Sequence, residues 1–193
     1  MIRVITKDHF FQGEHDLVHA LFECGLMELQ VRKPKASQSE IENWVNQIAI
    51  QFQDRLVIYD HDQIINPDRF KGIHYASIDR ADRSMIGYSR SCHSLVEVEK
   101  YAPFYKYLVL SPIYSSISKK GYAPKEDWDF SRVKDEIKDK LIALGGVSEN
   151  KLENLNSLGF KHFALFGAVW ESPEPLKSFK SILKKWENIA RNY

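Results

Sequence analysis

The chain has 193 residues, of which 44% are hydrophobic and 27% charged, and its formal net charge is +1. This composition is typical of a globular protein, and domains of roughly 100–200 residues are common, so we expect a single domain. Because the net charge is close to zero, no overall field attracts nucleic acid or an acidic membrane. We expect neither as a partner, and any anion binding must be local.

The cysteines and the N-terminal segment bear on the cellular compartment. The chain has only two cysteines, Cys24 and Cys92, which is too few for a disulfide framework and favours a reducing compartment. Residues 1–7 lack the long apolar run of a signal peptide, and no segment approaches the length that crosses a bilayer. We therefore expect a cytoplasmic protein.

Eight short segments rich in aliphatic and β-branched residues follow one another along the chain, and helix-sized intervals separate most of them. These predicted strands are residues 3–6, 27–32, 56–60, 72–76, 85–91, 107–112, 141–146 and 162–169. Apolar residues recur at helical spacing in the sets Leu17, Leu21 and Cys24; Ile41, Trp44, Val45, Ile48 and Phe52; and Phe179, Ile182, Leu183 and Trp186. Strand and helix therefore alternate.

This alternation predicts an α/β fold with a parallel sheet, and eight parallel strands close most simply into a (β/α)₈ TIM barrel. We expect residues 1–193 to form one compact TIM-barrel domain, slightly shorter than most barrels of this kind. Residues 77–84 have room for barely one helical turn, which predicts one degenerate crossover after strand 4. The alternative is an open doubly wound sheet, but the first strand lacks the Gly-x-Gly-x-x-Gly of its dinucleotide-binding version.

The sixth predicted strand leads into a loop rich in hydroxyl and ammonium groups. Residues 107–112 are apolar up to Ser111-Pro112, and the chain continues with Ser116, Ser118 and Lys119 before Gly121. Two hydroxyls and a cation suit a phosphate or pyrophosphate ligand. A solvated surface loop of the same composition is the alternative.

In a TIM barrel the carboxyl ends of all eight strands meet on one face, where activity is almost always built. Gln30 and Arg32 are two residues apart on a predicted strand, so both side chains point into the barrel mouth. The planar donors of arginine grip two phosphate oxygens at once. A structural arginine paired with a carboxylate is an equally weighted alternative.

Glycines and carboxylates also fall at predicted strand ends. Gly145-Gly146 and Gly167 let backbone N–H groups approach a phosphate closely, although any sharp turn uses glycine. Asp60 and Asp79 follow neighbouring strands and could share one Mg²⁺ ion, although two isolated aspartates are weak evidence for a metal.

Four of the seven histidines stand out by position. His15 and His19 lie four residues apart on a predicted helix of the outer layer, where we expect surface residues. His74 and His93 lie in or directly after strands, so each is either a general acid or base or a histidine hydrogen-bonded in the core.

Six motifs in register resemble the thiamine phosphate synthase and thiazole tautomerase family of barrels. They are Leu29-Gln30-Val31-Arg32, Ile58-Tyr59-Asp60, Gly72-Ile73-His74, Ser91-Cys92-His93-Ser94, residues 111–119 and residues 142–147. The resemblance covers nearly the whole chain.

The resemblance implies the joining of hydroxymethylpyrimidine pyrophosphate to hydroxyethylthiazole phosphate, with pyrophosphate released and Mg²⁺ as cofactor. It implies Arg32, Ser91 and Lys119 as catalytic residues and Asp60 and Asp79 as metal ligands. The implied substrate-binding residues are Gln30, Arg32, Tyr59, Ser91, Ser116, Ser118, Lys119, Gly146 and Gly167. The partners are then small phosphorylated substrates, and a homodimer is left open.

This sequence departs from the family pattern at several positions. Tyr59 stands where the synthases usually have Asn, and Pro34 where they have Lys, a cation that Lys33 or Lys35 could replace. Pro112 stands where the tautomerases have a catalytic His, which disfavours that branch. The alternatives to a synthase are a thiazole phosphate isomerase and a non-catalytic protein that binds phosphorylated ligands.

Overall fold

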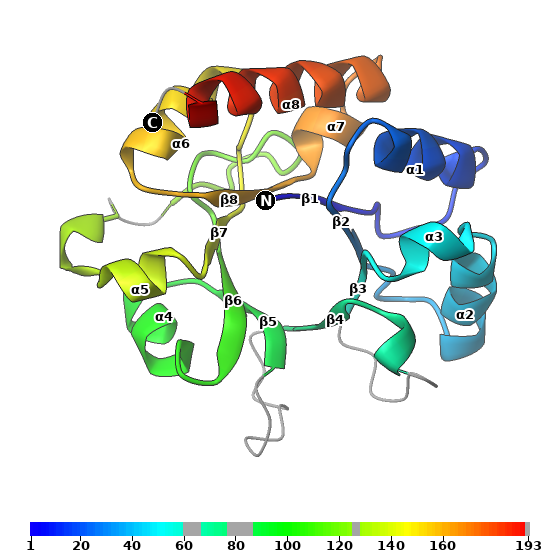
Figure 1. Ribbon diagram of the computed structural model, residues 1–193, viewed down its shortest axis with the longest axis horizontal. Helices are drawn as coiled ribbons and strands as arrows, with labels where there is room; N and C mark the ends of the chain where they lie inside the picture. The colour runs from blue at the N-terminus through cyan, green and yellow to red at the C-terminus, as the bar shows by residue number, and fades with distance from the viewer. Residues whose placement is uncertain (60–66, 77–86, 125–127, 192–193) are drawn as a thin grey trace.

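A computed structural model describes residues 1–59, 67–76, 87–124 and 128–191. In it the strands pair in chain order, each parallel to its neighbours, and β8 pairs with β1 to close the barrel (Figure 1). The strands are β1 (Ile2–Ile5), β2 (Glu28–Val31), β3 (Leu56–Tyr59), β4 (Gly72–Tyr75), β5 (Gly87–Cys92), β6 (Tyr105–Leu110), β7 (Leu141–Ala143) and β8 (His162–Leu165). The predicted TIM barrel is confirmed.

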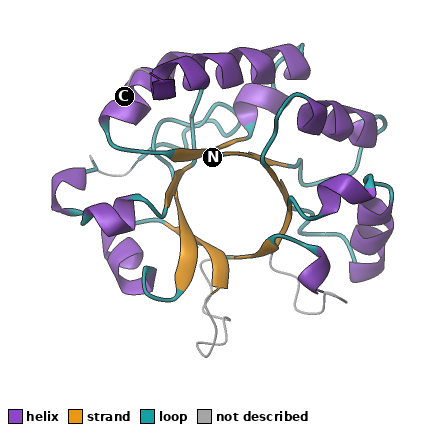
Figure 2. Ribbon diagram, in the orientation of Figure 1, coloured by secondary structure: helices purple, strands orange, loops and turns teal. Residues whose placement is uncertain are grey.

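The helices form an outer ring around the strands (Figure 2). They are α1 (Glu14–Glu23), α2 (Gln38–Asn46), α3 (Ile50–Gln53), α4 (Leu95–Tyr101), α5 (Asp135–Lys138), α6 (Leu152–Ser157), α7 (Gly167–Trp170) and α8 (Pro175–Arg191), with short 3₁₀ turns η1 (Pro67–Arg69), η2 (Phe130–Arg132) and η3 (Glu149–Lys151). Ser37 and Glu40 form a capping box at the start of α2. No helix of the described residues is long and apolar enough to cross a membrane.

Alternation along the strands divides the buried residues into two sets. Residues that face outward, such as Val4 and Leu29, pack against the helices in the main hydrophobic core. Inside the barrel a smaller apolar cluster consists of Ile5, Val109, Ile142 and Ala164, which come from β1, β6, β7 and β8. Polar side chains of β1, β2, β4 and β5 also lie in the interior: Arg3, Glu28, Gln30, His74, Ser89 and Ser91. The barrel interior therefore contains both an apolar cluster and a network of polar side chains.

One predicted strand ends earlier in the structure than the sequence suggests. The predicted strand over residues 162–169 is wrong beyond Leu165, because the chain turns at Phe166 and begins α7 at Gly167. The indole of Trp170 donates to the carbonyl of Ile5 at 2.6 Å, which fixes this helical turn against β1. A continuous apolar run does not distinguish strand from buried helix, so tertiary packing decided this boundary. The crossover predicted at residues 77–84 lies outside the described residues.

His15 and His19 are half-buried rather than free surface residues, which corrects that prediction. A ring nitrogen of His15 lies 3.0 Å from the carbonyl oxygen of Trp44, and His19 accepts a hydrogen bond from the backbone N–H of Ala49 at 3.1 Å. Both contacts join α1 to the chain of the next crossover. The reason is tertiary: α1 packs its histidine-bearing flank against the neighbouring helices.

Candidate active site at the carboxyl ends of the strands

A pocket of about 270 Å³ lies at the carboxyl ends of the strands. Its wall contains every described residue that the sequence predicted to be catalytic or substrate-binding: Gln30, Arg32, Tyr59, Ser91, Ser116, Ser118, Lys119, Gly146 and Gly167. These residues come from six different strands or the loops that follow them. Barrel closure therefore brings together residues up to 137 positions apart, from Gln30 to Gly167.

Arg32 directly follows β2, and its backbone is held by Thr6. The hydroxyl oxygen of Thr6 accepts from the N–H of Arg32 at 2.9 Å, and the hydroxyl donates to the Arg32 carbonyl at 3.3 Å. The guanidinium carbon lies 5.2 Å from the ring centroid of Tyr59. No carboxylate pairs with Arg32 among the described residues, whereas Arg3 makes the buried pair with Glu28 at 2.8 Å. The geometry favours the ligand-binding interpretation of Arg32 over the structural one.

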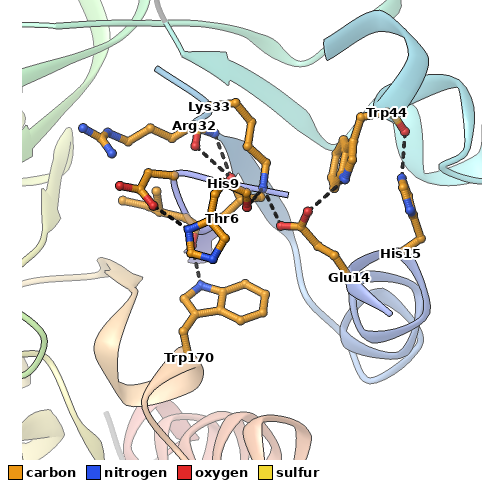
Figure 3. Close-up of polar contacts among 10 residues, drawn as sticks. Thr6, His9, Glu14, His15, Arg32, Lys33, Trp44 and Trp170 are labelled. Carbon is orange, nitrogen blue, oxygen red and sulfur yellow. Dashed lines mark hydrogen bonds and ion pairs between the residues drawn. The ribbon is translucent and has the colours of Figure 1, made fainter. Parts of the chain in front are cut away.

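Lys33 points toward Glu14, in a different direction from its neighbour Arg32 (Figure 3), and does not line the pocket. Its ammonium donates to Glu14 at 2.6 Å and to the carbonyl of His9 at 2.7 Å, and its side chain is fully buried. Burial lowers the pKa of Lys33, and the Glu14 carboxylate opposes that shift. Trp44 donates its indole N–H to the other oxygen of Glu14 at 3.0 Å. Lys33 thus joins β2 to α1.

The suggestion that Lys33 or Lys35 supplies the missing phosphate cation finds no support. Successive residues of a strand point to opposite sides, so Lys33 faces outward where Arg32 faces the pocket. Lys35 is exposed and does not line the pocket.

Hydrogen bonds within the loop after β6 fold it into a turn that contains Lys119. The hydroxyl oxygen of Ser116 accepts from the N–H of Lys119 at 3.0 Å. The N–H of Ser116 donates to the carbonyl of Tyr122 at 2.7 Å, and the N–H of Tyr122 donates to the carbonyl of Lys119 at 3.2 Å. These bonds form a tight turn that places Ser116, Ser118 and Lys119 in one wall of the pocket.

The glycines of the pocket permit close packing between its loops. Gly146 has φ 65°, and a Cβ there would overlap the carbonyl oxygen of Ser115 and lie 2.7 Å from the Cβ of Tyr114. A Cβ on Gly167 would lie 2.8 Å from the Cβ of Ile117. The loops after β7 and β8 therefore both rest against the loop after β6, and side chains at these two positions would separate them.

His74 forms part of the pocket floor and contacts two serines of β5. Its Nδ1 is 2.9 Å from the hydroxyl of Ser89, and its Nε2 is 2.9 Å from the hydroxyl of Ser91. Complete burial, and then the nearby guanidinium of Arg3, hold the pKa of His74 well below its usual value. The ring is therefore neutral at neutral pH, and it acts as a hydrogen-bonding residue of the core rather than as an acid.

His93 lies at the pocket rim and is exposed. Its Nδ1 is 2.9 Å from the carbonyl oxygen of Ser111. A carbonyl only accepts, so Nδ1 carries a proton in this contact and Nε2 is left to the solvent or a ligand.

The described part of the pocket wall contains no carboxylate, and the described residues contain no cluster of three or more potential metal ligands. Hydroxyls, amides and cations are poor ligands for Mg²⁺, which prefers carboxylate and phosphate oxygens. The described residues by themselves therefore do not form a magnesium site. The predicted ligands Asp60 and Asp79 lie outside them.

Sequence reasoning missed several residues of the wall. Ile5, Val109, Leu144, Ala164 and Phe166 supply apolar surface, and Tyr122 supplies a ring that lies 5.9 Å from the Lys119 ammonium. Their only sequence signal is a position near a strand end. Apolar residues there are indistinguishable from core residues until the barrel is closed.

The fold and this pocket define a class of protein, the (β/α)₈ barrels whose active site lies at the carboxyl ends of the strands. Within that class, the profile of the family described as thiamine monophosphate synthase matches residues 2–169. The chain belongs to this family.

Individual relatives agree with the family match. The chain is 25% identical over 186 residues to the thiamine-phosphate synthase of Actinobacillus succinogenes, with 86% of this chain and 84% of that protein covered. It is 20% identical over 181 residues to the thiamine-phosphate synthase of Prochlorococcus marinus, with 88% of this chain covered, but spans only 52% of that longer protein.

A solved structure shows the same likeness. The chain matches the crystal structure of thiamine phosphate pyrophosphorylase from Bacteroides thetaiotaomicron with a TM-score of 0.74, 26% identity and 97% of each chain covered.

Proposed function

We propose that this protein is a thiamine phosphate synthase, which joins hydroxymethylpyrimidine pyrophosphate to hydroxyethylthiazole phosphate. The observation that carries the proposal is the meeting of Arg32, Ser91 and Lys119, from β2, β5 and the loop after β6, in one pocket. In the reaction the bond between the pyrimidine methylene carbon and the pyrophosphate oxygen breaks, and its electron pair leaves with pyrophosphate. The lone pair of the thiazole nitrogen then forms the new C–N bond.

Negative charge grows on the leaving pyrophosphate, so the transition state needs cations at fixed positions. Arg32 is held by Thr6 and Tyr59, and Lys119 by the closed turn of its loop. The guanidinium of Arg32 and the backbone of Lys119 are placed before the substrate arrives, which limits the reorganisation needed during the reaction. In this proposal Ser91 adds a hydroxyl donor between them.

Gln30 has a fixed amide orientation that suits a pyrimidine. Its Oε1 accepts from the guanidinium of Arg3 at 3.2 Å, so its NH₂ group is the part left for the pocket. A pyrimidine ring nitrogen is an acceptor for that donor. We propose that Gln30 and the ring of Tyr59 bind the pyrimidine half of the substrate.

The thiazole phosphate would occupy the other wall of the pocket. Ser116 and Ser118 offer hydroxyls, and the loops at Gly146 and Gly167 offer backbone N–H groups without an obstructing side chain. Uncharged N–H and hydroxyl donors neutralise little of the charge on a phosphate. They therefore suit the phosphate of the thiazole substrate, which is not the leaving group.

We also propose that Asp60 and Asp79 bind the Mg²⁺ that the family resemblance implies. When bound, Mg²⁺ would neutralise charge on the pyrophosphate oxygens, and these two aspartates would supply the carboxylate ligands that the described wall lacks. Residues 1–193 would act as one cytoplasmic barrel domain on small phosphorylated substrates, without nucleic acid or membrane partners, as a monomer or homodimer. The comparisons favour the synthase over the isomerase and the ligand-binding alternatives.

The test is an assay of the purified protein with both phosphorylated substrates and Mg²⁺. We expect thiamine phosphate and pyrophosphate in equal amounts, and none when either substrate is omitted or when EDTA replaces Mg²⁺. Substrate binding without product, measured by calorimetry, would reject the synthase and favour the non-catalytic alternative. Full activity in EDTA would reject the magnesium proposal alone.

A further inference from the structure

A chain of buried polar side chains crosses the barrel interior below the pocket. Arg3 pairs with Glu28 and also donates to the hydroxyl oxygen of Ser89 at 3.3 Å. Ser89 contacts Nδ1 of His74, and Nε2 of His74 contacts the hydroxyl of Ser91, both at 2.9 Å. Arg3, Ser89 and His74 are at most 1% exposed, whereas Ser91 lines the pocket. These hydrogen bonds therefore connect a buried ion pair to the pocket.

The direction of each hydrogen bond follows from counting protons. A guanidinium only donates, so the oxygen of Ser89 accepts from Arg3. Among the described residues, the only other partner of the Ser89 hydroxyl is Nδ1 of His74. If Nδ1 carried a proton, Ser89 would accept twice and its own buried O–H would have no acceptor, which is costly. Ser89 therefore donates to Nδ1, which must be unprotonated.

The remaining steps follow from the neutral state of the ring. A neutral imidazole with a bare Nδ1 carries its proton on Nε2, so His74 donates to the oxygen of Ser91. Burial and the guanidinium of Arg3 disfavour a second proton on the ring. The hydroxyl proton of Ser91 has no acceptor among its protein contacts in the described residues, and it is left for the pocket.

We propose that Arg3, Ser89 and His74 act as positioning residues that make Ser91 a one-way hydrogen-bond donor to the bound substrate. An oriented O–H suits a pyrophosphate oxygen or a pyrimidine nitrogen, both of which only accept. The assignment of that acceptor rests on the proposed function, whereas the direction of the chain rests on the geometry alone. His74 thus acts through Ser91 and not as a proton shuttle.

The direction of the hydrogen bonds from Ser89 through His74 to Ser91 is tested by NMR of protein with ¹⁵N-labelled histidine. Two-bond ¹H–¹⁵N spectra separate the two neutral tautomers and the imidazolium, and loss of the signals in His74→Gln assigns them. We expect His74 as the neutral Nε2–H tautomer at neutral pH. Ser89→Ala removes the donor to Nδ1, so a second tautomer should become populated. An Nδ1–H tautomer in the unmodified protein would overturn the proposal whether or not the protein is a synthase.

The kcat/KM values of His74 variants test whether His74 orients the hydroxyl of Ser91. His74→Leu removes the donor to Ser91 and should lower kcat/KM roughly tenfold, the scale of one lost hydrogen bond. His74→Gln places an amide nitrogen near the position of Nε2, and we expect it to recover most of that loss. The control is His162→Gln, a histidine at the opposite, N-terminal end of the strands that does not line the pocket.

A double-mutant cycle separates positioning from general damage. If His74 acts only through Ser91, His74→Leu should cost nothing further in a Ser91→Ala background. If the losses of kcat/KM multiply in the double variant, His74 acts by another route. The same conclusion follows if His74→Gln is inactive although circular dichroism shows that it is folded. An inactive unmodified protein would reject the proposed function, and the NMR result would still decide the direction of the chain.

Discussion

The guanidinium of Arg32 lies over the ring of Tyr59, with 5.2 Å between the guanidinium carbon and the ring centroid. Another neighbour of that ring is His74, stacked at a centroid distance of 5.6 Å and an interplanar angle of 28°. Tyr59 stands where the resembling synthases usually carry Asn. Its ring therefore gives Arg32 a support that an amide cannot provide in the same way.

We expect Tyr59→Leu to weaken binding of the pyrimidine pyrophosphate. Loss of a cation–π contact of about 0.5–2 kcal/mol should raise its KM roughly 2- to 30-fold with a smaller effect on kcat. Tyr59→Phe keeps the ring and is the matched control. Steady-state kinetics of both variants would show an unchanged KM in Tyr59→Leu if the stacking has no role.

Lys119→Ala should lower kcat by about 10²–10³, because a fixed cation at a developing charge contributes on this scale. Lys120→Ala is the control, since Lys120 is an exposed neighbour in the same loop that does not line the pocket. Single-turnover rates of both variants, with both substrates saturating, measure the difference. Equal rates in the two variants would mean that the loop has been misinterpreted.

Gly146→Ala should affect both stability and binding. A residue with a side chain at φ 65° costs about 1–3 kcal/mol in backbone strain, and the new Cβ would push against the Ser115 carbonyl. Gly159→Ala is the matched control, because Gly159 has φ 86° and nothing closer than 3.9 Å to the added Cβ. Both variants should unfold at lower urea concentration, but only Gly146→Ala should raise the KM for the thiazole phosphate.

The buried pair of Lys33 and Glu14 should be a determinant of stability. Lys33→Met leaves the Glu14 carboxylate buried without its partner, and we expect a loss of about 3–5 kcal/mol in the free energy of unfolding. Lys35→Met, an exposed change two residues away, should stay within about 0.5 kcal/mol of the unmodified protein. Urea denaturation gives both values.

The same variant also tests the corrected role of Lys33. Because the Lys33 ammonium contacts Glu14 and His9 rather than the pocket, the KM values of folded Lys33→Met should be unchanged. A large rise in either KM would restore Lys33 as a ligand-binding residue.

His162 predicts a loss of stability in mild acid. Partial burial, and then the neighbouring N-terminal ammonium, lower its pKa from 6.5 to about 4. Between these values the unfolded chain binds the proton and the folded chain does not, so stability falls as the pH decreases from 6.5 toward 4. Allowing for the partial exposure of the ring, we expect its contribution to be about 1–2 kcal/mol.

Urea unfolding at pH 7.5 and at pH 4.5 measures this contribution as a difference between variants. His162→Gln should show a smaller loss between the two pH values than the unmodified protein. His9→Gln, at a side chain that is 65% exposed, should show the full loss. Identical losses in all three proteins would indicate that His162 titrates normally.

The sequence alone determined the fold and the position of the site along the chain. Eight β-rich segments at helix-sized intervals predict a parallel barrel because parallel strands need crossovers, and closure then requires that all strand ends share one face. Arg32 and Lys119 could be chosen for that reason before any contact was known, and the family resemblance added Ser91. This signal is the spacing of the β-rich segments along the chain, which can be recognised without knowledge of any tertiary contact.

Only the tertiary structure decided where individual side chains point and what they contact. Lys33 is next to Arg32 in sequence, yet it is buried against Glu14 and not in the pocket. The boundary at Leu165, the packing of His15 and His19, and the bonds from Arg3 through His74 to Ser91 were likewise not predictable. These features depend on cross-strand register and on helix packing, which join residues far apart in the chain and leave no periodic trace within it.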